Sequence, residues 1–197
     1  MFVGASAAIS DTTLVFSDDQ RLELRESAAT VIGGYAWPSQ ISIRAAIGVL
    51  AGGSLEGEGR TFDIGAGLIG SIGVARQWSR PPWFLSGSAG LGASRASTRE
   101  TLAGGMQGAR VSLTAIDARG GLAAGRTFGP FSPYVLARVF GGPVFWSWDG
   151  TDITGTDTRH FQLGAGASLA IGSRATILVD ISALGERAAS LGVAVNL

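Results

Sequence analysis

Hydrophobic and polar residues alternate along most of this chain with a period of two, the spacing that places successive side chains on opposite faces of a β-strand. In residues 41–53, Ile43, Ile47 and Val49 alternate with small or polar residues such as Arg44. The same pattern recurs in Phe62–Trp78, Phe161–Ile171 and Ile177–Ala183. These four segments predict strands with one strongly apolar face.

Weaker alternation predicts further strands in six segments: Val3–Ile9, Ala28–Trp37, Trp83–Ser97, Val111–Thr127, Tyr134–Trp148 and Ser190–Leu197. The sequence therefore predicts about ten strands, with eight as the alternative. The step Gly141-Gly142-Pro143 is either a bulge or a break in its strand. We expect residues 1–197 to form a single domain.

The predicted connections alternate between short and long. The short ones are turns rich in proline and glycine: 38–40, 79–82, 129–133 and 172–174. The long ones carry much of the charge: Ser10–Glu26, Ser54–Arg60, Arg99–Arg110, Asp149–Asp157 and Gly185–Ala189. Short turns on one side and long outer loops on the other are typical of transmembrane β-barrels. The predicted fold is an all-β, antiparallel, up-and-down transmembrane barrel.

Composition favours the same fold. The 197 residues include 31 glycines and only 15% charged residues, and every basic residue is arginine. A soluble β-sandwich or lipocalin-like barrel would expose the Gly, Ala and Ser faces to water, which makes a poor aqueous surface. No stretch approaches the roughly 20 apolar residues of a membrane helix.

Charge and cysteine content exclude other classes. The formal net charge is +0, so no long-range field attracts nucleic acid or anionic lipid. The chain has no cysteine, which rules out a disulfide framework and a thiolate metal site.

Aromatic residues lie near the ends of the predicted strands, where a bilayer has its interfaces. The predicted interfacial girdles consist of Tyr35, Trp37, Trp78, Trp83 and Tyr134 beside the short turns, and Trp146 and Trp148 beside the long loops.

Charged residues on the opposite faces would project into the barrel if the apolar faces touch lipid. This lumen network is predicted to contain Arg44, Asp63, Asp117, Arg119, Arg138 and Asp180, with Phe62 and Ile64 on the lipid side. Charges removed from water need partners, so we expect ion pairs that stiffen the wall, in preference to an ion-selective path. The small inward residues leave room for either a narrow channel or a loop.

The last strand carries a specific resemblance. Ser190, Gly192, Val195 and Leu197 resemble the C-terminal insertion signal of bacterial outer-membrane proteins, with leucine in place of the usual terminal phenylalanine. The resemblance implies recognition by the barrel-assembly machinery and a location in the bacterial outer membrane. The start at Met1 has no signal peptide, so we expect a mature chain whose leader has been removed. Arg76 and Arg95 lie on the lipid-facing register, where Arg95 could meet lipopolysaccharide phosphates.

Candidate chemistry is sparse. His160 is the single histidine, and its neighbours lack the His-x-Ser spacing of outer-membrane phospholipases and lipid A deacylases. The omptin proteases use Asp-x-His, but Thr158 occupies the aspartate position here and Asp157 lies three residues before His160. We expect no catalytic residues, metal or cofactor.

The sequence thus predicts a non-enzymatic outer-membrane barrel with a structural or partner-binding role through its outer loops and wall. The alternatives are a narrow, porin-like passive channel and, less favoured, an omptin-like or lipid-modifying enzyme. Expected partners are outer-membrane lipid and lipopolysaccharide, the barrel-assembly machinery and a protein at the outer loops, but no nucleic acid.

Overall fold

The computed structural model describes residues 1–16, 20–102, 106–148 and 150–197, without the side chain of Trp148. These residues form 13 strands in one antiparallel sheet. The strands are β1 (Phe2–Phe16), β2 (Arg21–Ala36), β3 (Ile41–Gly57), β4 (Arg60–Ile64), β5 (Gly67–Arg80), β6 (Trp83–Thr101), β7 (Gln107–Arg126), β8 (Phe131–Gly141), β9 (Val144–Trp148), β10 (Thr151–Asp157), β11 (Phe161–Ile171), β12 (Ala175–Gly185) and β13 (Arg187–Asn196). No helix in the described ranges is long and apolar enough to cross a membrane.

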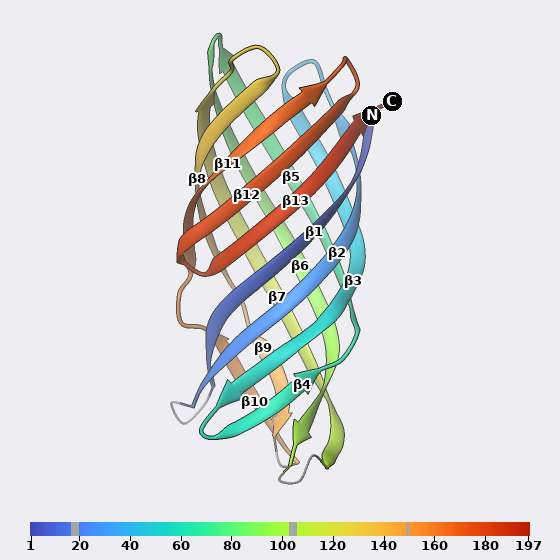
Figure 1. Ribbon diagram of the computed structural model, residues 1–197, viewed down its shortest axis with the longest axis vertical. Coiled ribbons are helices and arrows are strands. Elements are labelled where there is room, and N and C mark those ends of the chain that lie inside the picture. Colours follow the sequence, from blue (N-terminus) through green and yellow to red (C-terminus); the bar gives the residue numbers. More distant parts are fainter. Residues whose placement is uncertain (17–19, 103–105, 149) are drawn as a thin grey trace.

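The sheet closes on itself, because β13 pairs with β1 from Phe2 opposite Asn196 to Asp11 opposite Arg187. Figure 1 shows the strands tilted around a long barrel, with both termini at one end. A closed sheet has no unpaired edge along this seam.

Three passes across the wall are each divided in two, into β4 and β5, β8 and β9, and β10 and β11. The 13 described strands therefore make ten passes, which confirms the prediction of about ten antiparallel strands. Gly142-Pro143 is a break between β8 and β9, where the Pro143 carbonyl accepts a hydrogen bond from Ile116 N–H at 3.1 Å.

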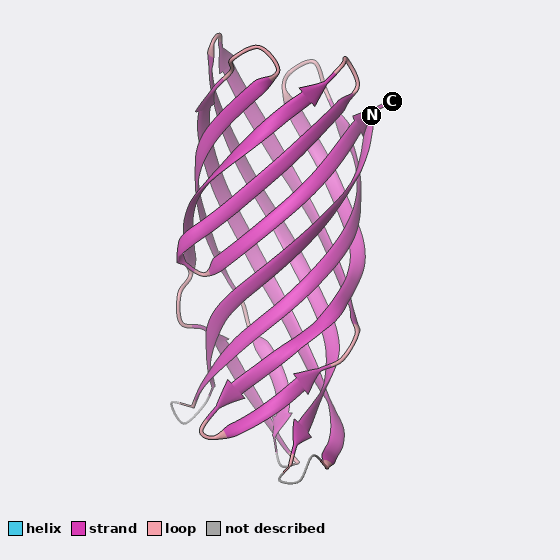
Figure 2. Ribbon diagram, in the orientation of Figure 1, coloured by secondary structure: helices cyan, strands magenta, loops and turns pink. Residues whose placement is uncertain are grey.

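The barrel has two tiers of different width (Figures 1 and 2). Ten strands close the wide tier near the termini: β1, β2, β3, β5, β6, β7, β8, β11, β12 and β13. Eight strands close the narrow tier beyond it: β1, β2, β3, β4, β6, β7, β9 and β10. The β12–β13 hairpin ends between the tiers, and there β10 replaces β13 beside β1.

Most of the residues expected to form long loops belong to the narrow tier, so that part of the prediction was wrong. β1 continues to Phe16, β2 begins at Arg21, and β10 occupies Thr151–Asp157. In Gly185–Ala189, only residue 186 lies outside the two strands. Short turns do connect the strands at the opposite end of the barrel (Figure 2).

The outer surface of the wide tier is apolar, as the alternation predicted. Ile47 is 70% exposed and Leu68 is 67% exposed, and both point away from the barrel. Other outward apolar side chains include Val31, Ile72, Leu91, Leu122, Val139, Ile181 and Leu191. This apolar band ends near the narrow tier at outward charged residues such as Asp11, Arg25, Arg95 and Arg187.

Inside the narrow tier the pattern is reversed. Buried apolar side chains fill its interior, and we call this cluster the apolar plug: Leu14, Phe16, Leu22, Leu50, Leu55, Phe62, Ile64, Ala96, Leu113, Val144 and Trp146. The Trp146 ring lies edge-on to Phe62 at 4.8 Å and tilted to Phe16 at 5.5 Å. Its indole N–H donates to Thr98 Oγ1 at 2.8 Å. An eight-stranded barrel has an interior that side chains can fill.

A β-bulge explains why Phe62 and Ile64 point inward. Ile64 lies opposite Thr98, but Leu68 lies opposite Arg95, so this pass has one more residue than β6. One extra residue moves the following side chains to the other face. The prediction that Phe62 and Ile64 face lipid together with Leu68 was therefore wrong.

The plug predicts a large stability difference between adjacent residues. Leu55→Ala should lower the free energy of unfolding by about 2–5 kcal/mol, because Leu55 is fully buried in the plug. The control Glu56→Ala changes an exposed side chain and should alter stability by no more than about 0.5 kcal/mol. Urea unfolding in detergent micelles measures both. Equal, small effects would show that the plug is not packed.

Candidate functional site

The wide tier encloses a cavity of about 430 Å³ beneath the apolar plug. Small residues on β5, β6 and β7 leave this space, and charged side chains from several strands project into it. The charged lining residues are Glu26, Arg44, Asp117, Arg119, Arg138, Asp157, Asp180 and Glu186. Five of the six residues predicted for the lumen network are among them.

Two ion pairs organise the charges of the cavity. Arg119 Nε contacts the Asp117 carboxylate on the same strand. Arg138 Nη2 lies 2.9 Å from Asp180 Oδ2, and Tyr134 donates its hydroxyl to Asp180 Oδ1 at 2.6 Å. These contacts link β8 to β12 across β11 and give the charges the partners that they need away from bulk water.

Glycines on neighbouring strands make space for both carboxylates. A Cβ on Gly92 would lie 2.6 Å from Asp117 Oδ1, and one on Gly166 would lie 2.4 Å from Asp180 Oδ1. Distances this short exclude any larger residue unless the carboxylates move. Gly92 and Gly166 therefore leave the space that the two carboxylates of the ion pairs occupy.

Arg44 and Asp63 have different positions. Arg44 lies in the cavity, where its Nε would be 3.6 Å from a Cβ on Gly73. Asp63 was wrongly predicted to face the lumen, because it follows the reversed register of β4 and is exposed on the outside. Its carboxylate accepts a hydrogen bond from Thr101 Oγ1 at 2.8 Å.

We call the level at which the wide tier meets the narrow tier the step. Three acidic residues at the step were missed by the sequence analysis: Glu26, Asp157 and Glu186. Thr12 Oγ1 donates to Asp157 Oδ1 at 3.1 Å, and Gln162 Nε2 donates to Glu186 Oε1 at 2.5 Å. Asp157 and Glu186 lay in segments predicted as loops, to which no inward face was assigned. Their inward position follows from the β12–β13 hairpin and from β10, whose pairing the sequence does not specify.

Glu186 is 9% exposed and lies in the β12–β13 turn, beyond the apolar band. Burial raises the pKa of its carboxyl to about 7, although Arg119 favours the charged form. The folded state therefore retains a proton that the unfolded chain releases near pH 4.5. Folding stability should fall as the pH rises between these two values, because the folded state then binds more protons.

Glu186→Gln should remove this pH dependence. The amide cannot ionise, so the variant should unfold at a higher temperature than the original protein at pH 8. The two midpoints should converge toward pH 4, where the glutamate is protonated in both states. Thermal unfolding in detergent at several pH values measures this, with the exposed Glu56→Gln as control. Midpoints that differ equally at every pH would contradict the assignment.

The predicted aromatic girdle is found at the short-turn end. The Tyr35 and Trp37 rings meet at 4.9 Å, and arginines lie over Trp78 and Trp83 at 5.3 and 5.4 Å. All four aromatic residues are exposed on the outside. This arrangement suits the interface of a bilayer.

The other girdle residues are placed differently. Tyr134 points inward to Asp180, and Trp146 is 2% exposed inside the plug, so both were wrongly predicted to be interfacial. The side chain of Trp148 lies outside the described residues.

The C-terminal residues form the closing strand. Gly192 pairs with Ser6 and Val195 with Val3, while Ser190 lies opposite Ala8. Leu197 N–H donates to the carbonyl of Met1 at 2.9 Å. Recognition of these residues by an assembly machinery stays a prediction.

Asp157 and His160, which the sequence analysis compared with the omptin motif, lie in different environments. Asp157 lines the cavity, whereas His160 is exposed in the break between β10 and β11. Among the described residues, no group of three or more His, Cys, Asp or Glu could hold a metal ion.

No family model and no curated protein matches this chain. Several solved structures match it. The translocator domain of the autotransporter NalP from Neisseria meningitidis matches with a TM-score of 0.60 and 13% identity, over 100% of this chain and 88% of that one. The outer-membrane protease OmpT from Escherichia coli matches with 0.53 and 12%, over 98% and 94%. The transport unit of the autotransporter AIDA-I from Escherichia coli matches with 0.51 and 11%, over 100% and 90%.

These likenesses show the fold, and the structure adds the surface that goes with it. A closed antiparallel barrel with an apolar outer band and an aromatic girdle is a transmembrane barrel. The chain has the fold of bacterial outer-membrane β-barrels. In such barrels the short turns face the periplasm, so we expect the narrow tier to lie outside.

Proposed function

We propose that this barrel is closed to solutes and acts as a structural, partner-binding element that presents its narrow tier outside the cell. The apolar plug is the observation that carries the proposal. Its side chains are at most 8% exposed and come from seven strands: β1, β2, β3, β4, β6, β7 and β9. Passage of ions needs a wet, polar path, which a packed apolar interior does not offer.

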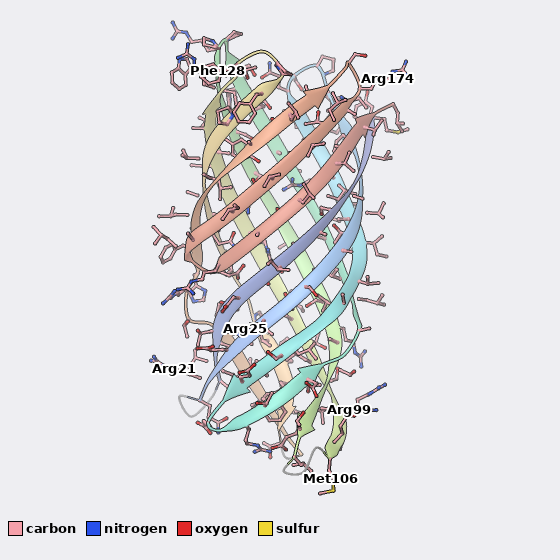
Figure 3. The ribbon with its side chains drawn as sticks, in the orientation of Figure 1. Arg21, Arg25, Arg99, Met106, Phe128 and Arg174 are labelled. Atoms are coloured by element: carbon pink, nitrogen blue, oxygen red, sulfur yellow. The ribbon has the colours of Figure 1, made fainter. Side chains whose placement is uncertain are left out.

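The narrow tier is suited to binding because its surface is polar and its backbone is held in strands. Arg60 forms an ion pair with Glu100 at 2.6 Å, joining β4 to β6, and Arg99 donates to Gln107 at 2.8 Å. Figure 3 shows Arg21, Arg99 and Met106 on the outside at this end. A binding surface on such a scaffold loses little conformational entropy when a partner docks.

A non-enzymatic role agrees with the sparse chemistry. The barrel shares its fold with an outer-membrane protease, but His160 is exposed while Asp157 lines the cavity. Lipid, lipopolysaccharide and the assembly machinery are further proposed partners.

A narrow channel is the second candidate, since the wide tier does hold a polar cavity of about 430 Å³. The cavity would conduct only if the plug opened. Planar-bilayer recording separates the two functions.

The original protein should insert without producing conductance steps. The double variant Phe62→Ala/Trp146→Ala removes two plug aromatics that pack at 4.8 Å, and it should produce discrete steps. Phe145→Ala is the matched control, because Phe145 precedes Trp146 but is 43% exposed, and it should stay silent. Heat-dependent mobility on gels verifies that each variant is folded. Steps from the original protein that change with Asp117→Asn would overturn the proposal in favour of a channel.

Orientation is tested separately, because the chain contains no cysteine and single cysteines can be placed freely. Thr61→Cys lies on the outside of the narrow tier and should react in intact cells with a maleimide too large for porins. Ser39→Cys, in an exposed short turn, should react only after the outer membrane is permeabilised. The reverse labelling pattern would place the narrow tier in the periplasm.

A further inference from the structure

The lipid-facing wall is hollowed along β13, β1, β2 and β3. A groove of about 690 Å³ lies over small side chains in the middle of the apolar band. Its floor is formed by Ala5, Ala7 and Ala29, with larger apolar side chains on both sides. We call it the lateral groove.

Strand register produces the lateral groove. Paired residues form one row across the four strands: Leu191, Ala7, Ala29 and Val49. The next row toward the short turns is Val193, Ala5, Val31 and Ile47. Small residues therefore lie between large ones, and the depression runs along the barrel wall.

A second hollow of about 560 Å³ continues the lateral groove toward the narrow tier. Its rows contain Ile9 between Ala189 and Ser27, and then Asp11 between Arg187 and Arg25. The apolar floor thus ends at two arginines in one row at the edge of the apolar band. Figure 3 shows Arg25 on this outer face.

The arginines are available for a stronger partner. Arg25 Nε lies 3.5 Å from Asp11 Oδ2, and Arg25 Nη2 lies 3.7 Å from Glu23 Oε2. The Arg25 side chain is 60% exposed, and long ion pairs at exposed sites contribute little. A phosphate carries more charge than a carboxylate and accepts paired hydrogen bonds from guanidinium groups.

We propose that the lateral groove binds one phosphorylated saccharolipid of the outer leaflet, the lipid A part of lipopolysaccharide. A phosphate lies against Arg25 and Arg187, and an acyl chain lies over Ala7 and Ala29. The charge at the band edge and the apolar depression below it match the two ends of such a molecule. The assignment to the outer leaflet rests on the proposed orientation, which the cysteine labelling tests independently.

Arg95 provides a comparison at the same edge of the band. It is exposed on β6 and donates to Ser112 Oγ at 3.3 Å, but it lines neither hollow. Simple snorkelling to headgroups would make Arg95 as important as Arg25. Binding in the lateral groove makes it dispensable.

Native mass spectrometry of the detergent-solubilised barrel with diphosphorylated lipid A tests the proposal. We expect a one-to-one complex that binds about tenfold more weakly in Arg25→Gln/Arg187→Gln, and an unchanged complex in Arg95→Gln. Ala7→Leu/Ala29→Leu fills the groove without altering charge, and it should also weaken the complex. A lipid A analogue without phosphates should bind the original protein and the arginine variant equally.

Several outcomes would overturn the assignment. Equal loss in Arg95→Gln would mean nonspecific attraction at the band edge. Loss only in the alanine variant would mean an acyl site without headgroup recognition. A protein dimer that excludes lipid A and dissociates in the alanine variant would assign the lateral groove to a second copy of the chain. Gel mobility shows that each variant is folded, and the arginine variant leaves the groove itself intact.

Discussion

Backbone pairing between β13 and β1 is the interaction on which the rest of the structure depends. In a bilayer every backbone N–H and C=O must find a partner within the protein, so the sheet has to close. β13 can pair with β1 only as far as Asp11, because the β12–β13 hairpin is short. β1 continues beyond it and pairs with β10 from Leu14 to Phe16. This second seam narrows the barrel from ten strands to eight, and the narrower interior is the one that apolar side chains fill.

Apolar side chains therefore face outward in the wide tier and inward in the narrow tier, although the same strands run through both tiers. The inward face of β1 becomes apolar through its residue types, without a change of register. Its inward positions are Gly4, Ser6 and Ala8 in the wide tier, then Leu14 and Phe16 in the narrow tier. The pass that contains β4 and β5 changes by a bulge, which turns an apolar face from outside to inside. In both cases the wide tier has an apolar outer surface that faces lipid, and the narrow tier has a polar outer surface that faces water.

Period-two alternation predicted the barrel and most of the lumen charges because Arg44, Asp117, Arg138 and Asp180 lie in stretches of regular pairing, away from the bulges of their strands. Asp63 was misplaced because a single bulge reverses its face, and Gly65-Ala66 alone does not distinguish a bulge from a continuous strand. Polar segments were predicted as loops because an outward polar face resembles a loop in composition. Pairings between β10 and β1, more than 130 residues apart, leave no local pattern.

The step between the tiers explains why the protein's binding surfaces are expected outside its lumen. Glu186 lies at the hairpin that ends the wide tier, so the cavity is bounded there by Glu26, Asp157 and the buried Glu186, and above them by the plug. Burial disfavours the charged carboxylate, which makes the step poorly suited to a hydrated path. The outer wall has no such restriction. The pairing of β13 with β1 also places Arg187 in one row with Arg25. The same contact that closes the barrel therefore brings together the two arginines at the charged end of the lateral groove.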